Sequence, residues 1–219
     1  MNASVLVYVQ HLLGIGHLAR ASLVAEGIRR AGLRVTLVLG GPPVAGFPAP
    51  GLETVALPPV KAGPEGFAQL VDSAGRPVGE AYLAGRRDKL LAAFETLRPD
   101  VLLIEAFPFG RRQMRFELEP LLERARGLER PPLVACSLRD IVQEGRKPGR
   151  DRETVDVLQQ NFDVVLVHGD PDLIALDATF PLAREIAPLI RYTGIVSGPV
   201  GGLQGEAFDV VVSAGGGAA

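Results

Sequence analysis

Short apolar runs alternate with longer segments of helical character along most of the chain. Two of the runs, 101–104 and 164–167, contain no polar residue, which is typical of parallel strands buried on both faces. The alternation predicts right-handed βαβ units and an α/β fold with a doubly wound, mostly parallel sheet and helices on both faces. We expect strands near 4–9, 34–39, 53–56, 101–105, 133–137, 164–168 and 190–193, and helices near 17–31, 79–97, 113–126, 151–161 and 181–187.

Residues 58–79 separate the third predicted strand from the second predicted helix. They contain Gly63, Gly66 and Gly75 among prolines, and we expect one long loop there. Loops of this length in compact domains are often functional. The alternative is that the loop only connects two elements.

The end of the chain predicts a second unit. A linker-like stretch at 195–205 precedes another apolar run at 208–213, which leads into Gly215, Gly216 and Gly217. A strand followed by a glycine turn is how an α/β unit opens. We therefore expect one domain over 1–203, and over 204–219 a linker with the first strand and glycine turn of a missing domain. That strand should be disordered here, or pair with a neighbouring chain and cause self-association.

Charge and composition exclude several classes of protein. The formal net charge is −2, which gives no reason to expect nucleic-acid binding. The single cysteine, Cys136, allows no intrachain disulfide. No apolar stretch approaches the roughly 20 residues of a membrane span, and no signal peptide is evident, so we expect a cytoplasmic protein. Peripheral membrane contact stays open, with a candidate surface around Phe107, Phe109, Arg111, Arg112, Arg115 and Phe116, for which a solvated basic helix start is the alternative.

A glycine turn with a histidine follows the first predicted strand. Gly14 and Gly16 let the backbone approach a ligand, and His17 stands where the next helix should begin. The positive end of a helix dipole disfavours a protonated histidine, so His17 should be neutral, as a general base must be. Arg20 lies one turn later and suits an anionic substrate. Helix capping or packing is the other interpretation of His17.

This turn also matches the dinucleotide-binding pattern G-x-G-x-x-G/A over residues 14–19. That function needs an acidic residue at the end of the second strand, which here ends at Leu39 followed by Gly40 and Gly41. An NAD enzyme is therefore disfavoured, and we expect no cofactor. No pair of histidines or cysteines has the spacing of metal ligands, so we also expect no metal.

Further polar residues follow predicted strands at the same edge of the sheet. Glu105 ends the fourth strand, where it could orient His17, bind sugar hydroxyls or cap the next segment. Arg139 and Asp140 follow the fifth strand and form either an ion pair or substrate contacts. After the sixth strand, Asp170 precedes Pro171 and favours a structural turn. His11 either lines the site or stabilises the glycine turn.

These motifs together resemble GT-B glycosyltransferases of family 28. The resemblance rests on their order and spacing over nearly the whole chain, namely 14–20, 98–105, 108–110, 137–141, 168–170, 191–194 and 211–217. It implies the Rossmann-like N-terminal domain of a GT-B fold, which mainly binds the acceptor. It also implies that a nucleotide-sugar is the donor substrate, that His17 acts on an acceptor hydroxyl, and that Gly14, Gly16, Arg20, Glu105, Arg139 and Asp140 bind substrate.

The resemblance explains the glycines at the end of the chain as well. Gly215, Gly216 and Gly217 match the loop near the donor diphosphate, whose domain is otherwise absent, so we expect this fragment to be inactive alone. Two alternatives stay open. One is a sugar-nucleotide 2-epimerase, which shares the two-domain architecture, and the other is a non-catalytic nucleotide- or sugar-binding domain.

Overall fold

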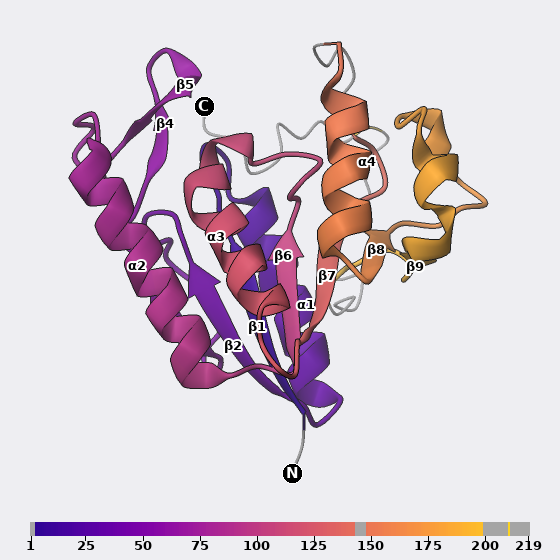
Figure 1. The fold of residues 1–219 in the computed structure, drawn as a ribbon, viewed down its shortest axis with the longest axis horizontal. Coiled ribbons are helices and arrows are strands. Elements are labelled where there is room, and N and C mark those ends of the chain that lie inside the picture. Colours follow the sequence, from indigo (N-terminus) through magenta and orange to yellow (C-terminus); the bar gives the residue numbers. More distant parts are fainter. Residues whose placement is uncertain (1–2, 143–147, 199–209, 211–219) are drawn as a thin grey trace.

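Seven strands form one wholly parallel sheet, in the order β3-β2-β1-β6-β7-β8-β9 (Figure 1). The structure is a computed structural model that describes residues 3–142, 148–198 and 210. It confirms the predicted α/β fold. The strands are β1 (Ser4–Val9), β2 (Arg34–Leu39), β3 (Glu53–Ala56), β6 (Val101–Glu105), β7 (Leu133–Arg139), β8 (Val164–His168) and β9 (Ile190–Tyr192).

The strand order reverses between β1 and β6. The chain runs outward from β1 through β2 to β3, then returns to place β6 on the other side of β1, where Val5 pairs with Val101 and Tyr8 with Ile104. The crevice outside the carboxyl ends of two such strands is where open α/β sheets bind ligands. We therefore expect a ligand site at the carboxyl ends of β1 and β6.

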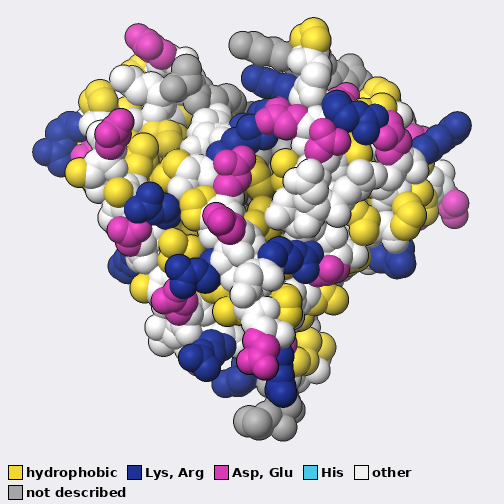
Figure 2. All heavy atoms as spheres, viewed as in Figure 1, with side chains coloured by type: hydrophobic (Ala, Val, Ile, Leu, Met, Phe, Trp, Pro, Cys, Tyr) yellow, Lys and Arg dark blue, Asp and Glu magenta, His cyan; other side chains and the backbone are white. Residues whose placement is uncertain are grey.

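Alternate residues of the strands build two separate cores, because successive side chains point to opposite faces of a sheet. Val5 and Val7 pack with helix α1 (Gly16–Arg30), whereas Leu6 and Tyr8 pack toward the other face. That second face is covered by the helices α2 (Glu80–Leu97), α3 (Arg115–Arg126) and α4 (Arg150–Asn161) (Figure 1). On the outer surface of these helices, side chains of both charges are interspersed (Figure 2).

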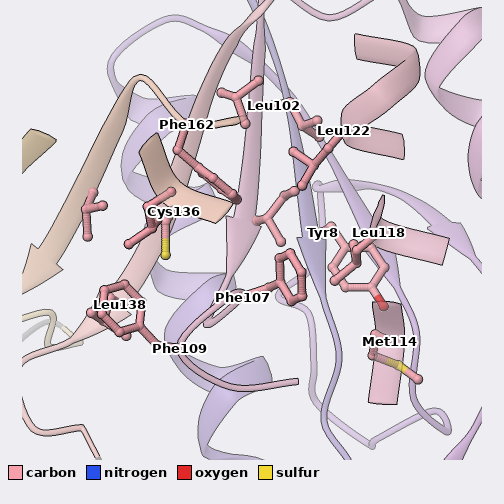
Figure 3. Close-up of a cluster of buried hydrophobic side chains, with 14 of the residues drawn as sticks. Tyr8, Leu102, Phe107, Phe109, Met114, Leu118, Leu122, Cys136, Leu138 and Phe162 are labelled. Carbon is pink, nitrogen blue, oxygen red and sulfur yellow. The ribbon is translucent and has the colours of Figure 1, made fainter. Parts of the chain in front are cut away.

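The segment after β6 is anchored by aromatic side chains. Phe107 is fully buried beside Tyr8 and Leu118 (Figure 3), and the ring of Phe109 meets that of Phe180 edge-on at 5.0 Å. Both phenylalanines therefore belong to the core, although they were expected near a candidate membrane surface. Their burial fixes the path of the chain between β6 and the short 3₁₀ helix Arg112–Met114.

One expectation about the fold was wrong. Residues 58–79 are not a single loop, because β4 (Lys61–Gly63) and β5 (Gly66–Val71) form an antiparallel hairpin. β4 has only three residues, a glycine lies at the turn end of each strand, and the register shifts beside Gly63. No clear two-residue alternation therefore marks the hairpin. The predicted helix near 181–187 is also altered, since Ala183–Leu189 forms a 3₁₀ helix that contains Pro188.

A buried ion pair ties the carboxyl ends of β1 and β2 to the helices. Arg86 of α2 and Glu117 of α3 are both fully buried and meet at 2.7 Å. Arg86 also donates to the carbonyls of Gly40 and Pro58, at 2.6 and 2.7 Å, while Tyr8 donates its hydroxyl to Glu117. Burial raises the pKa of Tyr8 well above its usual value, so this hydroxyl stays protonated. The network thus links the two helices α2 and α3 to the segments that follow β1 and β2.

The predicted start of a second domain lies almost wholly outside the described residues. This applies to the linker and strand of 204–219 and to Gly215, Gly216 and Gly217, with Val210 the one described position. Among the described helices, none combines the length and the apolar character needed to cross a membrane.

Candidate functional site

The glycine turn lies at the topological switch point. It follows β1, and α1 begins at Gly16 with Ile15 as its N-cap, without a capping side chain or an acidic residue in its first turn. The first backbone N–H groups of a helix have no partner within the helix, and the dipole there favours negative charge. A cavity of about 160 Å³ opens beside the turn and is lined by Leu13, Gly14, Gly16, His17 and Arg111. A Cβ atom at Gly16 would meet no atom within 4 Å, so this position borders open space.

His17 and Glu105 come from separate elements and form a hydrogen-bonded pair. Nδ1 of His17 lies 2.7 Å from Oε1 of Glu105. The carboxyl group of Glu105 is fully buried, whereas the side chain of His17 is 31% exposed. Of the three roles considered for Glu105, the orientation of His17 is the one that needs this contact.

This pair sets the tautomer of His17. With the proton on Nδ1 donated to the carboxylate, Nε2 is the acceptor nitrogen, and it has no protein partner within the described residues. Nε2 is therefore the ring nitrogen available to accept a proton in this tautomer.

Arg20 forms an ion pair with the same carboxylate oxygen of Glu105. Its guanidinium also lies 3.5 Å from Nδ1 of His17. The sequence suggested that Arg20 is a cation for an anionic substrate, but in the structure its charge is engaged by Glu105. The other oxygen of that carboxylate, Oε2, is buried without a hydrogen-bond partner within the described part of the chain.

Arg139 and Asp140 lie near this cluster but do not bond to each other. Arg139 donates from Nε to the carbonyl of Ile141 at 2.6 Å, and Asp140 accepts the N–H of Ile141 at 2.9 Å. Asp140 also packs against Gly169, where an added Cβ would come within 2.4 Å of it. Of the two alternatives for this pair, the ion pair is absent between these two described residues, and both side chains bond to the backbone of Ile141 instead.

A second histidine occupies the end of β8. Its ring bridges two hydroxyls, with Nε2 of His168 2.8 Å from Ser137 Oγ and Nδ1 2.7 Å from Thr193 Oγ1. Burial lowers the pKa of His168 to about 4, so the ring is neutral at physiological pH. It lines a cavity of about 370 Å³ together with Arg20, Arg139, Asp140, Ile141, Ile195 and Val196. Sequence reasoning did not assign this role to His168, since the ends of three strands meet only in the fold.

The remaining candidates have structural contacts. His11 is buried, and its ring packs so closely on Gly41 that a Cβ there would lie 2.3 Å from it. Burial lowers the pKa of His11. Asp170 accepts the N–H of Asp172 at 2.9 Å, which confirms the expected turn. The contact shown for His11 is therefore with the segment after β2.

Arg111 is a residue that sequence reasoning underestimated. It appeared there only as part of a basic surface, yet in the structure it lines two cavities beside His17. The neighbouring Arg115 pairs with Glu153, as does Arg112. In the described ranges, no group of three histidine, cysteine or carboxylate side chains is arranged to hold a metal ion.

Solved structures share this fold at low sequence identity. The UDP-N-acetylglucosamine 2-epimerase from Rickettsia bellii gives a TM-score of 0.53 at 11% identity, over 89% of this chain and 45% of that one. The glycosyltransferase SsfS6 from Streptomyces sp. SF2575 gives a TM-score of 0.49 at 15% identity, over 80% of this chain and 53% of that one. MurG from Acinetobacter baumannii gives a TM-score of 0.46 at 14% identity, over 77% of this chain and 42% of that one.

The chain thus spans about half the length of these proteins. No protein-family model and no curated protein matches it. The overlap with the epimerase supports an α/β Rossmann-like fold of the GT-B type. At 11% identity the likeness shows the fold, and the reaction must be argued from the site.

Proposed function

We propose that this chain is the acceptor-binding half of a GT-B glycosyltransferase of the family 28 type, with His17 as its general base. The observation that carries the proposal is the 2.7 Å contact between His17 Nδ1 and Glu105 Oε1 at the switch point. It leaves the basic nitrogen Nε2 on a partly exposed ring that lines two cavities. A general base needs this combination of access and orientation.

In the proposed step, the acceptor hydroxyl gives its proton to Nε2 of His17 while its oxygen bonds to the anomeric carbon of a nucleotide-sugar. The bond from that carbon to the diphosphate oxygen breaks, and the electron pair leaves with the nucleoside diphosphate. Glu105 stabilises the resulting imidazolium, and Arg20 forms an ion pair with the same oxygen of Glu105. The donor diphosphate would be held by the second domain, with Gly215, Gly216 and Gly217 in its first glycine turn.

In this proposal the other predicted substrate-binding residues surround the acceptor. Gly14 and Gly16 border the cavity beside His17, and the open space at Gly16 would admit a substrate group. Arg139 and Asp140 stand at the rim of the neighbouring cavity, where they would contact acceptor hydroxyls or the second domain. No metal or cofactor takes part in the step.

The experiment is to supply the full-length product of this reading frame with UDP-sugars and a panel of hydroxyl acceptors. We expect release of UDP that depends on the acceptor, and a new glycoside by NMR. The 219-residue chain should release none. Inversion at C2 of UDP-N-acetylglucosamine without an acceptor would overturn the proposal and establish the epimerase alternative. If none of the donors reacts, the result would favour a non-catalytic binding domain.

A further inference from the structure

Arg111 is a cation without a direct partner in the part of the chain that the structure describes. Its Nε is buried without a hydrogen-bond partner, and within residues 3–142 and 148–198 no carboxylate forms an ion pair with it. Burial lowers the pKa of Arg111, while the field of Glu105 opposes that shift. Glu105 itself bonds to Arg20 and His17. Arg111 is half-buried, and a guanidinium whose Nε is buried without a hydrogen-bond partner costs stability, so its placement calls for a reason.

The backbone holds this arginine in place. Ala106 and Arg111 have φ values of +62° and +58°, a left-handed conformation that is unfavourable for residues with a side chain. The N–H of Gly110 bonds to the carbonyl of Ala106 at 2.7 Å, and the N–H of Met114 bonds to that of Arg111 at 2.8 Å. Strain of this kind persists where surrounding structure imposes it and is frequent at functional sites.

The cavities beside Arg111 have a consistent chemistry. One, of about 270 Å³, is lined by His17, Arg111, Arg139 and a mainly apolar wall that includes Phe109, Leu138 and Ile141. The other is the cavity beside the glycine turn, which Arg111 shares with His17. Neither lining contains a carboxylate residue. The chemistry is that of a site for a negatively charged group attached to an apolar body.

We propose that Arg111 binds an anionic oxygen group of the acceptor, a phosphate ester or a carboxylate, next to the hydroxyl that His17 deprotonates. This inference rests on the proposed function and names its substrate class. The guanidinium would form charge-assisted hydrogen bonds with the anion, and the unpaired N–H groups at the start of α1 would add to them. The apolar wall would take the body of the acceptor.

Binding to the 219-residue chain tests this without any transfer reaction, so its failure is distinguishable from failure of the proposed function. The probes are phenyl phosphate, benzoate and neutral phenol, titrated by ¹H–¹⁵N NMR. We expect the two anions to shift amides of residues 13–17 and 106–111, and phenol to bind at least tenfold more weakly. The tighter of the two anions identifies which anionic group the site takes.

Variants of Arg111 separate recognition from structure. In Arg111→Gln the affinity for the anions should fall about tenfold to a hundredfold, the value of charge-assisted hydrogen bonds, while phenol binding stays unchanged. Arg111→Lys should retain part of the affinity. The control is Arg130→Gln, which removes an exposed arginine just before β7, at the opposite edge of the sheet.

Melting temperatures keep the test decisive. Arg111→Gln removes a half-buried charge that has no ion-pair partner among the described residues, so the free variant should melt at the wild-type temperature or above. Phenyl phosphate should raise the melting temperature of the wild type only. Equal binding of phenol and the anions would overturn the inference. Anion binding that Arg111→Gln leaves intact would overturn it as well, as would a large fall in the melting temperature of that variant.

Discussion

Glu105 and His17 are 88 residues apart in sequence, yet Oε1 of one lies 2.7 Å from Nδ1 of the other. They meet because β6 returns beside β1, so that the last residue of β6 faces the first turn of the helix after β1. The two partners of this contact thus come from elements that the reversal of strand order makes neighbours.

Replacing Glu105 by glutamine should impair turnover more than stability. The amide cannot supply the negative charge that stabilises the imidazolium of His17, so kcat of the full-length protein should fall by roughly two orders of magnitude. Steady-state kinetics on Glu105→Gln measures this. Glu129→Gln changes an exposed glutamate before β7 and is the matched control. Wild-type kcat in Glu105→Gln would contradict the orienting role.

His168 makes stability depend on pH. Its pKa is about 4 in the folded chain, against about 6.5 in the unfolded chain. The unfolded state therefore binds the extra proton first, and the free energy of unfolding should fall as the pH drops from about 7 toward 4, by up to about 3 kcal/mol. Urea denaturation at pH 7.5, 6 and 5 tests this. His168→Gln should flatten the dependence, and an unchanged slope in that variant would refute the assignment.

Arg86→Met should be strongly destabilising. It leaves Glu117 as a buried carboxylate without its cation, and frees the carbonyls of Gly40 and Pro58. Removing one partner of a buried ion pair costs about 3–5 kcal/mol. In chemical denaturation, Arg86→Met combined with Glu117→Leu should recover part of this loss. A single variant as stable as wild type would show that the network contributes little.

Two glycine-to-alanine substitutions should have opposite effects. At Gly169 the new methyl group would lie 2.4 Å from Cβ of Asp140, so Gly169→Ala should cost about 1–3 kcal/mol. Gly27 lies inside α1 with nothing within 4 Å of an added Cβ, and Gly27→Ala should stabilise by up to about 1 kcal/mol. Thermal melts of both variants check this, and equal effects would contradict the packing described here.

Much of the fold could be predicted from the sequence because local patterns determined it. Continuous apolar runs such as that of β6 have one compatible environment, between two layers of helices, and the predicted bounds of most strands agree with the structure. The hairpin β4–β5 was missed because β4 has only three residues and neither strand is a continuous apolar run.

The candidate site was only partly predictable for a different reason. His17 and Glu105 were found because each follows a strand, but their contact depends on strand order, which no local pattern encodes. Likewise, Arg20 and Arg111 look alike in sequence. Only the positions of the carboxylates distinguish them, since Arg20 is paired with Glu105 and Arg111 has no ion-pair partner among the described residues.

The most direct test of the account is the turnover of the full-length protein with His17→Ala. If His17 is the general base, kcat for sugar transfer should fall by roughly 10²–10⁴-fold, with the melting temperature unchanged and Arg130→Gln at the wild-type rate. A His17→Ala variant that keeps near wild-type kcat would contradict the central claim.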